Sequence, residues 1–528
     1  MTVIDRRHLL AAFPMLWMAA RAGALPPEPR NLIDAPGFSD TPFTLGVASG
    51  DPDAGGFVAW TRIVPEPAQP DGGMVAAPVR VGWEVARDPD FRQIVRHGDA
   101  IAHPELAHSV HVEVVGLDPA RPYWYRFTCG GHRSPAGRSA TLPLAAARLD
   151  RLRFAVAGCQ HYEEGLYTAW RRIADEPIDF VFHYGDYIYE GADRGPAPRR
   201  VGGRVMTPIR RHTHGEIQSI TDYRLRYALY KADPDLQAAH AAAPWFVSFD
   251  DHEVDNNWAG DRDQDGTPPE LFLMRRAMAM QAYYEHMPLR RRSMPVAGSM
   301  RMYRDARFGD LMHGFFLDTR QYRSDQAYGD SDVAQGPDVY SPDRTMLGDA
   351  QEGWLFDGLA RSSARWNLVA QQVRLMNMLY TKPGQDVPVA SMDQWSGYMH
   401  SQRRLLGHIA DHCPGNVMTV SGDAHRHYAG DLVHDQRGTI VSSEFLATSI
   451  TSGADGVGDD DAFTRSAKAH TSALMAMTDR RGYVLCDVGR DSFRGDLKIL
   501  DTVAVPDGRL STYASFVSER GKPGLHRA

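Results

Sequence analysis

The stretch FVFHYGDYIYE, residues 180–190, decides the fold of this chain. Its short apolar run ends in Gly185-Asp186, and a polar loop follows. The same succession recurs in RFAVAGCQ (153–160), WFVSFDDHEVDNN (245–257) and VMTVSGDAH (417–425). Alternation of strand, polar loop and helix is typical of an α/β sheet, where ligand sites gather at the carboxyl ends of strands. The pattern therefore predicts a catalytic α/β domain over residues 151–500, with its site at four strand ends.

These four strand ends carry side chains of the types that bind metals. The candidate metal ligands are Cys159, Asp186, Tyr189, Asp251, Asn256, Asp423 and His425. Asp250 is an alternative to Asp251, or a second ligand beside it. So many acidic donors in one place repel one another unless cations lie between them, so bound metal is the simplest interpretation.

The motifs GDxxY (185–189), DDHE (250–253) and GDxH (422–425) resemble those of the calcineurin-like metallophosphoesterases. In the purple acid phosphatase branch, Asp, Asn and His stand where this chain has Cys159, Asp251 and Asp423. These departures resemble the PhoD-type alkaline phosphatases. The stretches YALYKADPDLQAAHAAAPW (227–245), LDTRQYR (317–323) and MLGDAQEGWL (346–355) are similar to that family too, so the resemblance covers residues 42 to about 500.

This resemblance implies an α/β/β/α sandwich of metallophosphoesterase type, preceded by a fibronectin III-like β-sandwich over residues 42–143. It implies Fe³⁺ with one or two Ca²⁺ ions, bridged by Asp186, and hydrolysis of phosphate esters by a metal-activated hydroxide or oxide. Hard oxygen donors at Asp251 and Asp423 favour Ca²⁺ over Zn²⁺. His252 is the candidate catalytic residue, either protonating the leaving group or orienting the phosphate.

The residues outside the catalytic domain give further expectations. Alternating apolar residues in 57–61, 79–85, 109–114 and 123–127 predict the strands of the β-sandwich. Residues 501–528 are expected to be a C-terminal tail, polar from Gly508 and frayed. The Asp318-Thr319-Arg320 turn is interpreted as structural, with support of the metal ligands as the alternative.

The first 24 residues resemble a secretory signal peptide. Arg6 and Arg7 precede an apolar run (9–20) and small residues at the end of the segment. The arginine pair indicates the twin-arginine export machinery as a partner, and a periplasmic or secreted mature protein. The apolar run is shorter than the ~18 residues of a spanning helix, so no integral membrane span is expected.

Composition excludes several other classes of protein. The net charge of −8 argues against nucleic acid as a stable partner. The four cysteines form no CxxC pair, which argues against a zinc ribbon and leaves one disulfide open. A zinc hydrolase of amides or lactams would need an HxHxDH-type cluster, which is absent. Two alternatives stay open: a phospholipase D-like phosphodiesterase, and a non-catalytic cell-surface binding protein on a degenerate phosphatase scaffold. The natural substrate and the preference for monoesters or diesters are not determined by the sequence.

Overall fold

Two large β-sheets stack face to face at the centre of the computed structural model, which describes residue 29, residues 31–201 and residues 203–528. The first sheet has ten strands, in the spatial order β26 (Lys522–Arg527), β25 (Leu510–Glu519), β24 (Ser492–Leu500), β23 (Gly482–Gly489), β9 (Arg151–Ala157), β10 (Phe180–His183), β13 (Trp245–Val247), β1 (Val47–Asp53), β2 (Gly56–Arg62) and β5 (Ser109–Val114). The second has seven, in the order β14 (Arg304–Phe308), β15 (Met312–Phe316), β17 (Trp366–Ala370), β19 (Val417–Ser421), β21 (Thr439–Leu446), β20 (His427–His434) and β22 (Leu474–Thr478).

Alternation along the central strands divides their side chains between two cores. On β10, Phe180 and Phe182 enter the core between the two sheets, whereas Val181 faces the helices outside. On β19, Met418 enters the same inter-sheet core, and Val417 packs against the helices of the other face. Alternate residues of a strand point to opposite faces, so a strand that is covered on one face by a sheet and on the other by helices has apolar residues on both faces.

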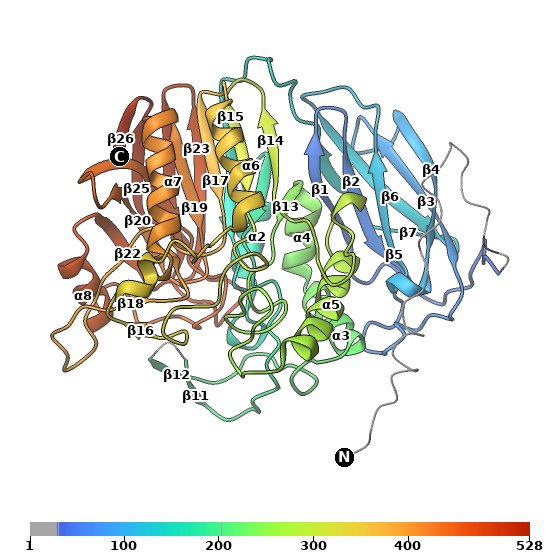
Figure 1. Cartoon of the computed structure of the whole chain (residues 1–528). Helices are drawn as coiled ribbons and strands as arrows, with labels where there is room; N and C mark the ends of the chain where they lie inside the picture. The colour runs from blue at the N-terminus through green and yellow to red at the C-terminus, as the bar shows by residue number, and fades with distance from the viewer. Residues whose placement is uncertain (1–28, 30, 202) are drawn as a thin grey trace.

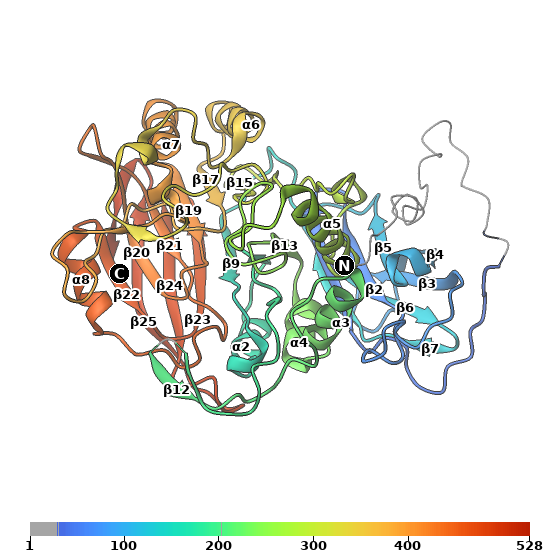
Figure 2. The same cartoon turned by 60° about the horizontal axis from the view of Figure 1, so that its bottom comes forward.

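Helices cover the outer face of each sheet (Figures 1 and 2). Those over the first sheet are α2 (Thr168–Ala174), α3 (Ile220–Lys231), α4 (Pro234–Ala242) and α5 (Pro269–His286). Those over the second are α6 (Gly348–Ala360), α7 (Met399–His412) and α8 (Ala462–His470). The result is the predicted four-layer α/β/β/α sandwich, so the fold class is confirmed.

The N-terminal region forms a β-sandwich, as predicted. Its outer sheet contains β4 (Ile94–Ala102), β3 (Val79–Ala86), β6 (Pro122–Cys129), β7 (His132–Arg133) and β8 (Gly137–Ala140). Its other sheet is β1-β2-β5, and these strands extend the ten-stranded catalytic sheet because β1 pairs in parallel with β13, Gly50 opposite Trp245. The two regions therefore share one sheet, which the sequence did not reveal.

Two short antiparallel sheets of two strands each complete the set of strands. They are the hairpin of β11 (Arg199–Val201) with β12 (Arg204–Met206), and the pair of β16 (Asp332–Val333) with β18 (Ala390–Ser391), whose strands come from two separate connections. Figure 1 shows both below the two large sheets.

The expectation of a frayed tail was wrong for most of residues 501–528. β25 pairs with β24 along its length, and β26 pairs with β25 at the edge of the catalytic sheet. Phe516 and Leu525 are buried in the inter-sheet core, which anchors strands whose outward residues are polar. An edge strand that buries only one face contains many polar residues, so its sequence resembles that of an exposed tail.

Three further expectations bear on the chain as a whole. The predicted signal peptide, residues 1–24, lies outside the described residues. Across the part that the structure describes, no helix has the length and apolar character needed to span a membrane. All four cysteines are described, buried and free, so the disulfide that the sequence left open is not formed.

Candidate active site

The predicted ligands meet where β9, β10, β13 and β19 end. Three overlapping groups of donor atoms form there, and within each group the atoms lie within 4.8 Å of one another. The groups are Cys159–Asp186–His425, Asp186–Asp251–His252 and Asp250–Asp251–Asp423. Asp186 is shared by the first two groups and Asp251 by the last two, so the set is one continuous chain of donors.

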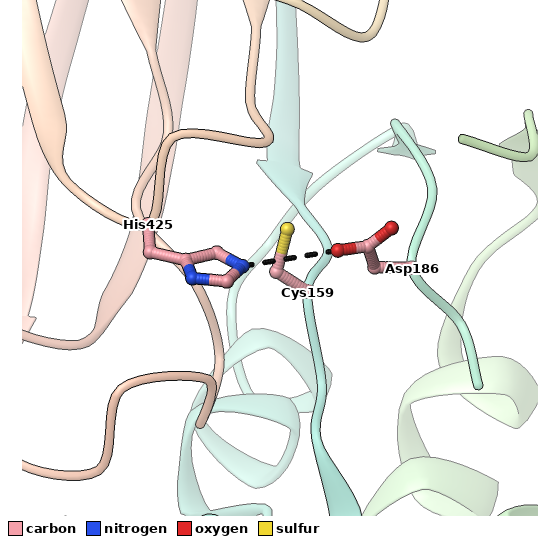
Figure 3. Close-up of side chains that lie close together, drawn as sticks. All are labelled: Cys159, Asp186 and His425. Atoms are coloured by element: carbon pink, nitrogen blue, oxygen red, sulfur yellow. Dashed lines mark ion pairs between the residues drawn. The ribbon is translucent and has the colours of Figure 1, made fainter. Parts of the chain in front are cut away.

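The first group is drawn in Figure 3, with Cys159 between Asp186 and His425. The Nε2 atom of His425 lies 3.8 Å from Oδ2 of Asp186. Tyr189 joins this group, because its hydroxyl lies 2.8 Å from Asp186 Oδ2 and 3.2 Å from His425 Nε2. A thiol, a carboxyl, a phenol and an imidazole from three separate stretches of sequence thus converge on one point.

The backbone at these ligands adopts conformations that non-glycine residues rarely use. The φ angles of Cys159, Asp186, Asp423 and His425 are 51°, 55°, 66° and 54°. Left-handed conformations of this kind cost free energy and cluster at functional sites, where the surrounding fold holds them. Here these conformations turn the backbone sharply after each strand and direct the ligand side chain across the edge of the sheet.

Two glycines permit the close approach of the ligand loops. A Cβ atom on Gly185 would lie 2.3 Å from Cβ of Asp250, and Gly185 has a φ of 133°. A Cβ atom on Gly422 would lie 2.1 Å from the ring of Tyr184. The glycine of each Gly-Asp motif is therefore required by packing as well as by the turn.

The electrostatics of the cluster fit bound cations. Asp186 Oδ1, Asp250 Oδ2 and Asp251 Oδ1 are buried, and none has a hydrogen-bond donor among the described residues. Burial, and then the charge of Asp251, raise the pKa of Asp186 to about 7; burial likewise raises the pKa of Asp423 to about 7. Buried acceptors without donors are costly, and a cation offsets that cost directly.

One arginine compensates part of this negative charge. The guanidinium of Arg320 is fully buried and donates to Asp250, to both oxygens of Asp393 at 3.0 and 3.1 Å, and to Asp423 at 3.4 Å. Burial would raise the pKa of Asp251, but Arg320 and His252 outweigh burial and hold it well below its usual range. The turn at residues 318–320, interpreted as structural, therefore supplies a residue of the site.

Glu253 holds two of the ligand loops together. Its buried carboxylate accepts hydrogen bonds from the backbone N–H groups of Tyr187 (2.6 Å), Asp250 (2.8 Å) and Asp186 (3.2 Å). The loop after β10 is thereby fixed against the loop after β13. This role of Glu253 was not predicted from the sequence, although the DDHE motif contains the residue.

A cavity of about 400 Å³ opens beside the cluster. It is lined by Asn257, Asp332, Arg374, Tyr380, Ser391, Asp393, Gln394, Asp423, Ala424, Arg426, Tyr428 and Phe463. Because Asp423 belongs to both the donor cluster and the wall, a small molecule in this cavity reaches the predicted metal site.

Two family models of known proteins match this chain. The family model of the PhoD-like phosphatases matches residues 154–497, and that of their N-terminal domain matches residues 30–143. The chain belongs to the PhoD-like phosphatase family. The resemblance drawn from the motifs is thereby confirmed.

Relatives within the PhoD-like family support the assignment over the whole chain. Alkaline phosphatase D of Bacillus subtilis (strain 168) is 44% identical over 496 residues, covering 93% of this chain and 83% of that protein. A solved structure described as the structure of PhoD superposes with a TM-score of 0.89 at 43% identity, covering 94% of this chain and 93% of that one. A solved structure of GAP50 of Plasmodium gives a TM-score of only 0.33 at 11% identity, covering 66% of this chain and 85% of that one.

One of the predicted ligands of this PhoD-like chain makes other contacts. The side chain of Asn256 donates to Gln264 at 2.6 Å, and its backbone N–H donates to Glu190 at 3.1 Å. Its neighbour Asn257 donates its backbone N–H to Asp251 at 2.8 Å and lines the cavity. The other six predicted ligands, together with His252, lie in the donor cluster or contact it directly. Their roles as ligands remain a prediction.

Proposed function

We propose that this chain is an exported phosphoesterase that holds Fe³⁺ and one or two Ca²⁺ ions and hydrolyses phosphate esters outside the cytoplasm. The observation that carries the proposal is the continuous chain of donors linked by Asp186 and Asp251, in a member of the PhoD-like phosphatase family. Family membership supports a phosphate ester hydrolase and disfavours a non-catalytic scaffold, because all four ligand loops are intact.

The donor types divide the cluster into two halves. Cys159 and Tyr189 would provide an anionic thiolate and phenolate, which donate strongly and stabilise Fe³⁺, and His425 and Asp186 complete that half. The carboxylates of Asp250, Asp251 and Asp423 provide the hard oxygens that suit Ca²⁺. When bound, such ions acidify water and offset the charge of the phosphoryl oxygens.

His252 is placed to donate a proton or a hydrogen bond to the substrate. Its Nδ1 atom lies 2.7 Å from Oε2 of Glu190, and a ring nitrogen lies within 4.8 Å of the carboxylates of Asp186 and Asp251. Glu190 fixes the orientation of the ring and favours its protonated form. In that form His252 donates a hydrogen bond to the phosphate or a proton to the leaving oxygen.

The metal assignment is tested on the purified mature protein without added metal. We expect about one iron and at least one calcium per chain by elemental analysis, and a broad visible band from phenolate bound to iron. Tyr189→Phe removes the phenolate, so the band is expected to disappear. Tyr187→Phe is the matched control, because its hydroxyl lies 2.8 Å from His240 and outside the cluster; its band should be unchanged.

Hydrolysis is measured on the same samples with 4-nitrophenyl phosphate and bis(4-nitrophenyl) phosphate. Turnover that falls with chelation and returns with the native metals supports the proposal. Zinc or manganese without a visible band would refute the iron assignment and leave a phosphoesterase. Absence of turnover in a fully loaded protein would refute the function itself.

Export is tested by replacing the arginine pair at the N-terminus. With Arg6→Lys and Arg7→Lys together, we expect the uncleaved precursor to accumulate in the cytoplasm, because the twin-arginine machinery reads both side chains. The readout is cell fractionation followed by immunoblotting of precursor and mature forms. Export of the doubly substituted chain at the normal level would contradict this route.

A further inference from the structure

The cavity beside the donor cluster contains a buried arginine that forms no ion pair with any acidic side chain in the part of the chain that the structure describes. Arg374 is 3% exposed and lines the cavity. Among the described residues, no carboxylate lies within ion-pair distance of its guanidinium, and its Nη2 atom has no hydrogen-bond acceptor. Its Nε atom donates to the backbone oxygen of Met376 at 3.3 Å. A buried charge without a partner is costly, so its retention in a cavity wall indicates a ligand of opposite charge.

The other arginine of the cavity differs in this respect. Arg426 donates two hydrogen bonds to Asp461, at 3.1 and 2.9 Å, and lies 3.3 Å from Asp479. Its charge is therefore neutralised within the protein. Of the two arginines that line the cavity, Arg374 is therefore the one whose charge is available to a ligand.

Glu444 is buried and its carboxylate feels the charge of Arg374, but the two side chains form no ion pair. The carboxylate of Glu444 accepts hydrogen bonds from the backbone N–H groups of Leu375 (2.9 Å) and Met376 (2.8 Å) and from the Ser421 hydroxyl (2.6 Å). Its oxygens are thus directed to the backbone beside Arg374 and not to the guanidinium.

Aromatic side chains supply an apolar wall near this cation. The rings of Tyr380 and Phe463 meet edge to face with centroids 4.6 Å apart, and the guanidinium of Arg374 lies 5.7 Å from the centre of the Tyr428 ring. All three aromatic residues line the cavity. Such surfaces favour a carbon skeleton, flat or chain-like, between the phosphoryl group and a second polar group.

We infer that Arg374 binds a second negative charge on the leaving group of the phosphate ester. The favoured substrates are esters whose alcohol or phenol carries a further carboxylate or phosphate, with a carbon spacer that packs on Tyr380 and Phe463. Arg374 acts as a specificity residue and takes no part in bond cleavage. This inference rests on the proposed phosphoesterase function.

Asp332 is a negatively charged residue of the cavity, and its removal tests whether charge in the cavity determines substrate selectivity. It also lines the cavity, and it has no ion pair in the part of the chain that the structure describes. Its charge opposes an anionic leaving group, whereas that of Arg374 attracts one. Asp332→Asn should therefore shift selectivity in the direction opposite to Arg374→Gln.

The experiment compares two phosphate monoesters that differ in one remote charge, 4-ethylphenyl phosphate and 3-(4-phosphonooxyphenyl)propanoate. Their phenols have similar acidity, so chemistry at phosphorus is matched. The wild-type enzyme is expected to prefer the propanoate in kcat/KM. Arg374→Gln should lower that preference about tenfold or more, mainly through KM, since hydrogen bonds to charged groups contribute strongly to binding. Arg374→Lys should restore part of it.

Arg437→Gln is the control, because it removes an exposed arginine that pairs with Asp411 at 2.7 Å and does not line the cavity. Its preference should stay within about twofold of the wild type, with thermal melting used to verify folding of every variant. Equal loss of both activities in Arg374→Gln, or no preference in an active wild-type enzyme, would overturn the inference. Hydrolysis of neither ester by the metal-loaded wild type would instead refute the proposed function.

Discussion

Asp186→Asn is expected to lower kcat/KM for phosphate esters by on the order of 10³-fold and to reduce bound metal at the same time. Asp186 is the carboxylate shared by the thiol-imidazole group and the group of Asp251 and His252. An amide cannot bridge two cations with the charge that a carboxylate supplies. Loss of several kcal/mol of charge stabilisation corresponds to a rate effect of this size. The measurements are steady-state kinetics and elemental analysis of the same preparation.

Asp193→Asn controls for removal of an acidic residue from the same segment. Asp193 is paired with Arg211 near the surface, so its loss should change activity less than about twofold. If Asp186→Asn kept both metal and activity, the shared carboxylate would not be part of the metal site. The donor chain would then need another bridge.

Arg320→Met is expected to destabilise the protein in the absence of metal by roughly 3–5 kcal/mol, the usual cost of leaving buried charges unpaired. The substitution removes the donor that Asp250, Asp393 and Asp423 share, within a fully buried cluster. Added Ca²⁺ should recover part of the loss, because the cation takes over the compensation of the same carboxylates. The measurement is urea-induced unfolding with chelator and with Ca²⁺.

Two variants define the origin of that effect. Arg320→Lys keeps the charge but loses the planar set of donors, so it should be destabilised less than the methionine variant. Arg361→Met removes an exposed arginine that pairs with Asp357 at 3.0 Å and should cost less than about 0.5 kcal/mol. A methionine variant as stable as the wild type would show that the acidic cluster is not held by Arg320.

Much of the fold could be predicted because the central strands are covered on both faces. Continuous apolar runs such as 180–184 and 245–249 identify such strands without tertiary information. The C-terminal strands were not predicted, because β25 buries alternate residues and β26 buries only Leu525, so that polar residues dominate both sequences. The β1–β13 pair was not predicted either, since strand pairing between distant segments leaves no local signal.

Site residues that directly follow a central strand could be predicted from the sequence, whereas those supplied by distant loops could not. Cys159, Asp186 and Asp423 could be found because each follows its strand within three residues, beside a glycine. Arg320 and Asp393 could not, because they reach the cluster from loops some 70 residues or more away from Asp250. The stretch 317–323 contains Arg320, but its sequence does not show which side chains Arg320 contacts. Asn256 was chosen over Asn257, because nothing in the sequence shows which of two adjacent amides turns toward the cavity.

The position of β26 at the edge of the catalytic sheet has a consequence for biosynthesis. β26, residues 522–527, follows the other nine strands of its sheet in the sequence, yet it completes the edge of the sheet whose central strands, β9 and β10, carry Cys159 and Asp186 at their ends. The amino-terminal sandwich can begin to fold during translation, but the ten-stranded sheet can be completed only once residues 522–527 have been synthesised. The proposed export of a folded protein suits this order of assembly, because the sheet and its ligand loops would be complete before transport.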